Sequence, residues 1–316
     1  MKKKLLATAT VAGIAGLVLG GFTIEKEGIS ALIEEKIANF SNIEQKKEIA
    51  NQVLLDTGKS EIYNINDLEQ VEIYFGNITE NDERDVVISV SFGPKNTILA
   101  VYTNDGNSYE YLGTIGDFYE IKKVSFIPID ANTQDVIIVN EFANQGVGAY
   151  EQSELLRGYF YKDDEFQNVL STPIVIEAAW NELWENNEII TSNQWKKVLQ
   201  TSDVTWKTTE APTTLDIKKY QRYLTVDNDD QKTVPKKEEF VEQDKRVVSE
   251  HQKWSDTWQR FIVGEGVEIS SGETVAIVEI RDDSPYAMSG YIENSYGIQR
   301  QDGTYDIVKT SEISTL

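Results

Sequence analysis

Two stretches decide the fold: NITENDERDVVISVSF at residues 77–92 and IPIDANTQDVIIVNEF at residues 127–142. A shift of 50 residues places Asp85 on Asp135 and Phe92 on Phe142. In each stretch a polar segment rich in Asn and acidic residues runs into a β-branched segment, as where a turn leads into a strand. The chain therefore contains two copies of a β unit about 50 residues long.

The segments around these stretches also alternate with period two, which predicts strands from residue 60 to residue 172. Asn104–Gly106 predicts a hairpin turn, because Asn and Gly adopt positive φ readily. Lys162–Asp164 predicts the corresponding turn of the second copy. This turn lies 58 residues after the first one, and not 50, so Gln145–Gln152 is interpreted as an eight-residue insertion in the second copy. For residues 59–226 we predict a β-repeat domain, either β-propeller-like or a meander.

Gly76–Ile88 resembles the start of an FG-GAP/VCBS-type repeat, the blade unit of integrin-α-type propellers. The resemblance covers about residues 60–172 and implies a calcium-binding loop. The ligand positions that it implies in the first copy are Asn77, Thr79, Asn81 and Asp85. In the second copy the loop is one residue short, and Asp130, Asn132 and Asp135 are its polar remnant.

Of these positions in the first copy, only Asp85 keeps the family's residue, and Asp82 stands where the family has glycine. Calcium takes about six to eight oxygen ligands, several of them carboxylates. Because the loops offer too few, we expect no bound metal. No catalytic, cofactor-binding or metal-binding residue is assigned, and no cofactor is expected.

The first 24 residues predict a signal peptide or an N-terminal membrane anchor. Lys2–Lys4 precede the uncharged run Leu5–Ile24. The run is long enough to span a bilayer, yet its glycines suit a cleaved signal, so both alternatives stay open. We expect the remainder to be extracellular, either secreted or held at the cell membrane by residues 5–24.

The composition narrows the classes of function. A net charge of −23 repels phosphate backbones, so nucleic-acid binding is not expected. With no Cys and one His, the chain offers no disulfide, no thiolate metal site and no histidine-based zinc site.

The flanking regions complete a mainly β fold with flanking helices (α+β). Residues 25–58 predict a helical stalk or cap, and Ile217–Leu224 a short helix. Residues 227–263 predict a linker followed by an amphipathic helix over 236–263. Residues 264–316 predict five short strands that form a small β-barrel-like domain, similar to SH3-like barrels.

Side chains that could carry chemistry also have structural interpretations. We expect His251 to be a solvent-facing residue of the predicted helix. The tryptophan pairs Trp180/Trp184 and Trp254/Trp258 could be sugar-stacking platforms or core anchors, and the core is favoured. We expect the acidic pairs to lie in solvated turns: Asp163–Asp164, Asp229–Asp230 and Asp282–Asp283.

Two functions remain open. A third alternative is that the protein is only a spacer that presents its C-terminal domain. The first is a membrane-tethered, non-enzymatic module that binds a protein or a cell-wall polymer. It predicts that aromatic side chains of the 143–152 insertion and neighbouring loops are exposed on one face. The second is a carboxylate-dependent hydrolase of envelope polysaccharide, which requires two acids converging in a cleft.

Overall fold

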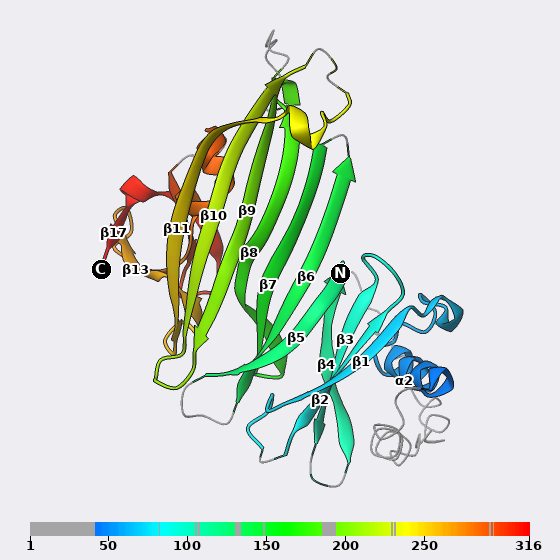
Figure 1. The fold of residues 1–316 in the computed structure, drawn as a ribbon. Coiled ribbons are helices and arrows are strands. Elements are labelled where there is room, and N and C mark those ends of the chain that lie inside the picture. Colours follow the sequence, from blue (N-terminus) through cyan, green and yellow to red (C-terminus); the bar gives the residue numbers. More distant parts are fainter. Residues whose placement is uncertain are drawn as a thin grey trace, which may run out of the picture.

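The protein is mainly β, with antiparallel sheets (Figure 1). A computed structural model describes residues 42–316 except 82, 105, 107, 130–133, 148, 185–193, 229, 231, 291 and 293. The described α-helix is α2 (Ile43–Asp56), which lies within the 25–58 segment predicted to be helical. The predicted leader at residues 1–24 lies outside the described residues.

The described strands form three sheets, in the orders β1-β2-β3-β4, β12-β11-β10-β9-β8-β7-β6-β5 and β16-β15-β14-β13-β17. Their bounds are β1 (Gln70–Gly76), β2 (Asp85–Ser91), β3 (Thr97–Asn104), β4 (Tyr109–Phe118), β5 (Glu120–Pro128), β6 (Asp135–Val147), β7 (Ala149–Lys162), β8 (Glu165–Asn181), β9 (Gln194–Lys207), β10 (Thr214–Asp227), β11 (Val241–Ser255), β12 (Arg260–Ile262), β13 (Gly264–Glu268), β14 (Thr274–Ile280), β15 (Ser295–Gln299), β16 (Tyr305–Lys309) and β17 (Ile313–Thr315). Short 3₁₀ turns join them: η1 (Ile65–Asp67), η2 (Glu182–Trp184), η3 (Lys237–Glu239), η4 (Arg281–Asp283), η5 (Pro285–Ser289) and η6 (Thr310–Glu312).

The first sheet lies between α2 and the second sheet (Figure 1). The buried face of α2, including Ile49 and Val53, packs against Val86 and Ile88 of β2. The alternate residue Val87 contacts the other core cluster, which contains Ile137 of β6. Both faces of β2 are therefore buried, which explains why apolar residues stand at the adjacent positions 86–88 and do not alternate with polar ones.

The two repeated stretches occupy equivalent places in the fold. Strands β1 and β5 begin at residues 70 and 120, and β2 and β6 begin at residues 85 and 135, so both pairs keep the 50-residue shift. The insertion lengthens the β6–β7 hairpin, which stays paired to Val147 and Ala149. Because strands β5 to β12 are joined into one sheet, the strand order is a meander, and the described residues form no separate radial blades.

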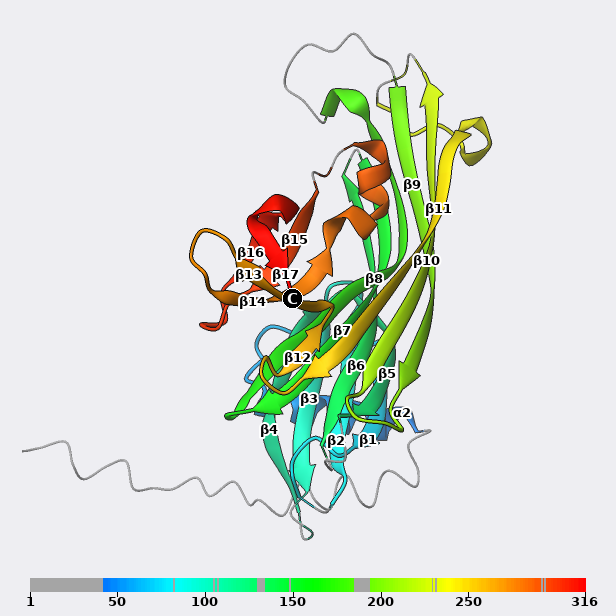
Figure 2. The same ribbon diagram turned by 90° about the vertical axis from the view of Figure 1, so that its left-hand side faces the viewer.

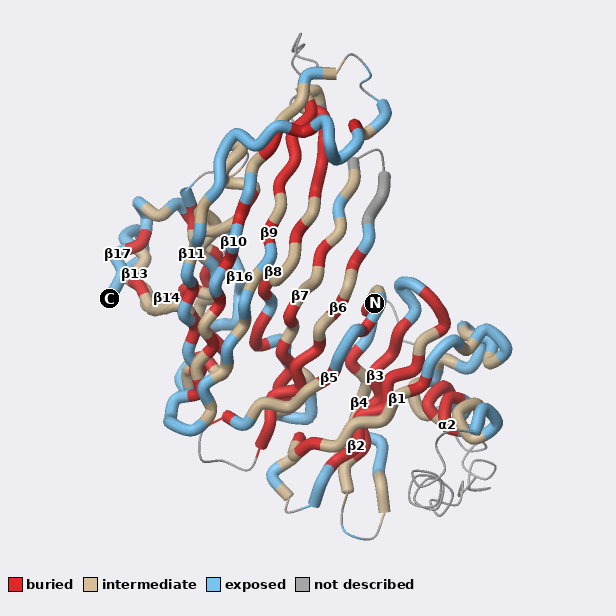
Figure 3. Tube along the Cα trace, in the orientation of Figure 1, coloured by how far each residue is buried: buried red, intermediate tan, exposed pale blue. Residues whose placement is uncertain are grey.

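The second sheet is a half-barrel, and the third sheet lies in its hollow (Figure 2). At the end nearest the first sheet the half-barrel curls until β12 contacts β8. A core cluster that includes Phe160, Leu170, Trp254 and Phe261 lies within this curl. At the far end Phe240, which follows η3, belongs to a cluster with the buried Trp195. Figure 3 shows the buried positions along these strands.

The helices predicted over 217–224 and 236–263 are wrong. Residues 217–224 lie within β10, and β11 occupies most of the second segment. The inward positions of these strands are partly polar: Lys219, Gln221, Glu250 and Gln252 are all buried. Their polarity hides the period-two alternation that would have identified strands. Residues 241–262 therefore belong to the half-barrel and are not a linker with a helix.

The third sheet is a small unit with its own core. Val275, Ile277, Ile298 and Ile313 form its buried cluster. Strand β17 returns after η6 to pair with β13, the first strand of the unit. Through η5 the unit contacts β9 and β10, where Tyr286 packs with a cluster of the half-barrel.

Candidate functional site

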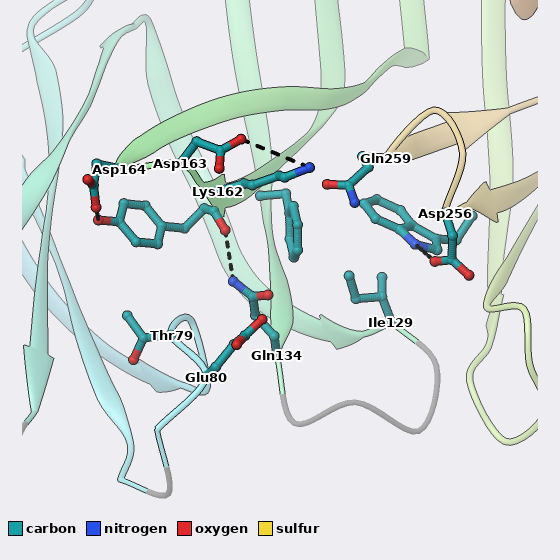
Figure 4. A pocket seen from close by; sticks show the side chains of 12 residues that line it. Thr79, Glu80, Ile129, Gln134, Lys162, Asp163, Asp164, Asp256 and Gln259 are labelled. Atoms are coloured by element: carbon teal, nitrogen blue, oxygen red, sulfur yellow. Dashed lines mark hydrogen bonds and ion pairs between the residues drawn. The ribbon is translucent and has the colours of Figure 1, made fainter.

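A polar cleft of about 680 Å³ opens where the curled end of the half-barrel meets the first sheet (Figure 4). Three loops form the part of its rim that carries acidic side chains: the β1–β2 loop, the β7–β8 turn and the β11–β12 turn. Ile129 and Gln134, from the connection between β5 and β6, also line the cleft. Its size is within the usual range of small-ligand sites, about 300–1,000 Å³. The lining residues are Thr79, Glu80, Ile129, Gln134, Phe160, Tyr161, Lys162, Asp163, Asp164, Trp254, Asp256 and Gln259.

The β1–β2 loop is held by Asp85, whose side chain is fully buried. Its Oδ2 accepts hydrogen bonds from the backbone N–H of Ile78 (2.8 Å) and of Thr79 (2.7 Å) and from the Thr79 hydroxyl (2.9 Å). Its Oδ1 accepts from the backbone N–H of Asn104 at 3.1 Å. The carboxylate thus fixes the segment that presents Thr79 and Glu80 to the cleft.

The positions that the FG-GAP resemblance marks as calcium ligands therefore bond to the protein itself. Asn81 donates its amide to the carbonyl of Asn104 at 2.8 Å. Among the described residues, no three side chains of His, Cys, Asp or Glu are placed to hold a metal ion. Asp130 and Asn132 lie outside the described residues.

The second repeat joins the first at this cleft. Asp135 Oδ2 accepts from the backbone N–H of Asn77 at 2.9 Å, and the Asp135 N–H donates to the Asn77 carbonyl. Burial raises the pKa of Asp135, although this hydrogen bond and Arg84 oppose the shift. Gln134 donates to the carbonyls of Ile78 and Tyr161, both at 2.8 Å. Hydrogen bonds therefore connect the β1–β2 loop to β6 and β7.

The β7–β8 turn places two acids on the rim. Lys162 pairs with Glu165, and the two intervening residues have positive φ, 50° at Asp163 and 63° at Asp164. This is the geometry of a two-residue hairpin turn, in which Asp and Asn tolerate positive φ. Asp164 Oδ1 accepts a hydrogen bond from the Tyr161 hydroxyl at 3.2 Å, and Lys162 Nζ lies 4.0 Å from Asp163 Oδ2. The predicted solvated turn is correct here, since Asp163 is 79% exposed.

The β11–β12 turn supplies the opposite rim. Asp256 accepts from Trp254 Nε1 at 2.9 Å, which fixes its carboxylate (Figure 4). Gln259 has φ of 50°, and its Oε1 is a buried acceptor without a hydrogen-bond partner in the described chain. Phe160 meets Trp254 edge to face, with ring centroids 5.2 Å apart, and both belong to the wall of the cleft.

The lining is acidic and rich in hydrogen-bond acceptors. Four carboxylates face one ammonium group: Glu80, Asp163, Asp164 and Asp256 against Lys162. Gln259 adds the unpartnered acceptor and Thr79 a hydroxyl. Ionised carboxylates accept hydrogen bonds and donate none. The cleft is therefore suited to a ligand with many donors, such as hydroxyl, amide or ammonium groups.

Other predicted candidates lie elsewhere. His251 is on strand β11, not on a helix; its side chain is 58% exposed and its Nδ1 lies 2.7 Å from Asp216. Trp180, Trp254 and Trp258 are at least 91% buried, so they are core residues and not exposed stacking platforms. The side chain of Trp184 lies outside the described part.

Two further expectations differ from the structure. Asp282–Asp283 lies in η4, where burial raises the pKa of Asp283, and not in a solvated turn. Tyr150, the aromatic residue of the 143–152 insertion, is partly buried against the cluster of Ala179 and Trp195. The insertion is paired strand, and Tyr150 is not part of an exposed loop surface.

Sequence reasoning missed Gln134, Asp256 and Gln259 as residues of a site. Gln134 directly precedes the repeated Asp135, which is the one signal that ties it to the repeat loops. Asp256 and Gln259 fall in the segment predicted to be helical, so no turn was expected there. They reach the cleft only because the half-barrel curls.

No family model matches the chain, and no curated protein matches it. In the described part of the chain, no helix is both long enough and apolar enough to cross a membrane.

Proposed function

We propose that this protein is an exported, non-enzymatic binding protein whose cleft takes a donor-rich polymer of the cell envelope. Residues 5–24 direct its export and, if uncleaved, hold it at the membrane. The polymer class is a polysaccharide bearing hydroxyl and amino groups. The observation that carries this proposal is the lining of the cleft, where three separate loops contribute four carboxylates against a single ammonium group.

The rim is pre-organised for binding. Asp85 fixes the β1–β2 loop, Gln134 ties it to β7, and Trp254 fixes Asp256. Groups that are already positioned lose little conformational freedom when a ligand binds. Such a cleft favours recognition by hydrogen bonds to sugar hydroxyl or amino groups.

Two finer proposals concern the architecture. The FG-GAP/VCBS resemblance is supported by the 50-residue shift that the paired strands keep, although the strands form a meander. For the third sheet we propose an SH3-like barrel. The order β17-β13-β14-β15-β16, with the 3₁₀ turn η6 before the last strand, supports it.

The test is a binding titration of the full chain with soluble fragments of cell-wall polysaccharide. Replacing two rim carboxylates, Glu80→Gln with Asp163→Asn, is expected to raise Kd about a hundredfold or more, because the two charged acceptors are together worth about 3–6 kcal/mol. Glu83→Gln with Glu238→Gln removes two exposed acids outside the lining and serves as the control. Equal Kd values for the two double variants would refute the assignment of the cleft.

A second candidate is a carboxylate-dependent hydrolase of the same polymer. The four carboxylates in one cleft favour it, because glycoside hydrolysis uses a pair of acids that flank the scissile bond. Release of new reducing ends from the polymer, lost in Glu80→Gln/Asp163→Asn, would establish this candidate. Binding without release supports the binding protein.

A further inference from the structure

A second cleft, of about 450 Å³, lies between the half-barrel and the third sheet. Leu170 and Phe261 from the half-barrel and Val278 from β14 give it an apolar wall. Gln252 and Arg260 supply polar groups from the half-barrel, and the Tyr305 hydroxyl supplies one from the third sheet. The cleft is separate from the proposed polymer site, with which it shares no lining residue.

The hydrogen-bond partner that the described residues give Arg260 is neutral. Its Nη1 donates to Gln299 Oε1, which is a neutral acceptor, and its Nε is buried without a hydrogen-bond partner among the described residues. No described carboxylate forms an ion pair with it. Burial lowers the pKa of Arg260, the direction expected for a desolvated cation that lacks a neutralising partner.

Two other cations of these sheets are paired with carboxylates. Lys219 pairs with Glu250 at 2.6 Å, and both side chains are buried. Arg300 pairs with Glu268 at 3.0 Å. A buried guanidinium stays protonated, so an unpaired one is costly unless an anion binds to it. Arg260 has no such pairing among the described residues, and it lines the cleft.

Glu279 limits which anions fit. Its Oε2 accepts from the Tyr305 hydroxyl at 3.1 Å, and it also lines the cleft. This carboxylate repels a multiply charged anion more strongly than a singly charged one. A planar carboxylate with a single charge matches the guanidinium fork, and the apolar wall can take its hydrocarbon part.

We propose that this cleft binds a small organic monocarboxylate, with its carboxylate on Arg260 and its apolar body against Leu170, Phe261 and Val278. The ligand would bridge the half-barrel and the third sheet. It would therefore strengthen their association when bound.

The test uses the full chain with hexanoate, hexan-1-ol and inorganic phosphate as probes, measured by calorimetry and by thermal unfolding. Hexanoate is expected to bind one to one and to raise Tm. Hexan-1-ol is expected to bind at least tenfold more weakly, because it has no charge for Arg260. Phosphate is expected to bind more weakly than hexanoate, because of Glu279.

Three variants test the roles of Arg260 and Glu279 directly. Arg260→Gln is expected to weaken hexanoate binding at least tenfold and to raise the Tm of the ligand-free protein by about 2 °C or more, since it removes an uncompensated charge. Arg260→Lys retains the charge without the fork and is expected to bind at intermediate strength. Glu279→Gln is expected to bind hexanoate more tightly.

Three outcomes overturn the proposal. The first is no saturable binding of hexanoate at up to about 50 mM, a concentration at which even weak millimolar sites fill. The second is hexanoate binding that Arg260→Gln leaves unchanged. The third is tighter binding of phosphate than of hexanoate.

Discussion

Replacing Asp85 by asparagine is expected to destabilise the protein and to loosen the β1–β2 loop of the cleft. The change is nearly isosteric, so it leaves no cavity. It converts one of the two carboxylate oxygens, which together accept four hydrogen bonds, into an NH₂ donor. The side chain is fully buried, so water cannot replace the lost acceptor.

The magnitude follows from the hydrogen-bond pattern. The remaining carbonyl oxygen can occupy the Oδ2 position and keep the two bonds from Thr79 and the one from Ile78. The amide NH₂ then faces the N–H of Asn104, so one bond to a charged acceptor is lost and a buried donor is left unpaired. A lost bond of this kind costs about 1.5–3 kcal/mol, so we expect a loss of about 2–3 kcal/mol. Asp85→Ala, which removes all four bonds, is expected to lose about 4–5 kcal/mol.

Urea unfolding of the full chain, followed by fluorescence and by far-UV circular dichroism, measures the free energy of unfolding. Glu83→Gln lies in the same loop, is exposed, and is expected to change it by less than about 0.5 kcal/mol. If Asp85→Asn also changes the free energy by less than about 0.5 kcal/mol, the carboxylate does not hold the loop. The claim that Asp85 pre-organises the β1–β2 loop at the rim of the cleft would then be wrong.

Three further changes test other contacts. Lys219→Met leaves the buried Glu250 unpaired and is expected to cost about 3–5 kcal/mol in urea unfolding, whereas adding Glu250→Gln is expected to recover a large part of it. Gly158→Ala is expected to cost about 1–3 kcal/mol, because its Cβ would lie 2.9 Å from the Cβ of Leu170. Burial raises the folded-state pKa of Asp283. Ionisation of Asp283 therefore destabilises the fold as the pH rises above the unfolded pKa of about 4. The gain in Tm from Asp283→Asn is expected to be larger at pH 7 than at pH 4.

Each of these three predictions has an experimental result that would contradict it. A double variant as unstable as Lys219→Met would show that the lysine acts by packing and not by pairing. Gly116→Ala, whose nearest neighbour would be the flexible end of Lys59 at 3.6 Å, serves as the control for Gly158→Ala and is expected to lose less. A stability gain from Asp283→Asn that is equal at pH 4 and pH 7 would exclude ionisation as its cause.

The β character of the chain was predictable because it depends on local pattern. The 50-residue shift located the second strand of each repeat, and positive φ at Asp163 and Asp164 forms the turn that their sequence predicted. The turn needs only neighbouring residues and the repeat is visible in the sequence itself, so one sequence contains both signals.

The half-barrel could not be predicted, because its inward positions depend on partners far along the chain. Glu250 is buried only because Lys219 lies beside it, and Gln221 only because it meets Gln200 and the carbonyl of Asp283. Polar residues at inward positions gave β11 a false helical pattern. The cleft was missed for the same reason, since Asp256 and Glu80 line one cleft only through the curl of the sheet.

The most direct test of the polymer cleft is amide hydrogen exchange of the full chain with and without a saturating cell-wall polysaccharide fragment. We predict slower exchange in residues 77–81, 162–165 and 256–259, which form the three rim loops, and unchanged exchange in β9 and β10, which contribute no lining residue. Protection confined to other segments, with these three loops unchanged, would contradict the assignment of this cleft as the binding site.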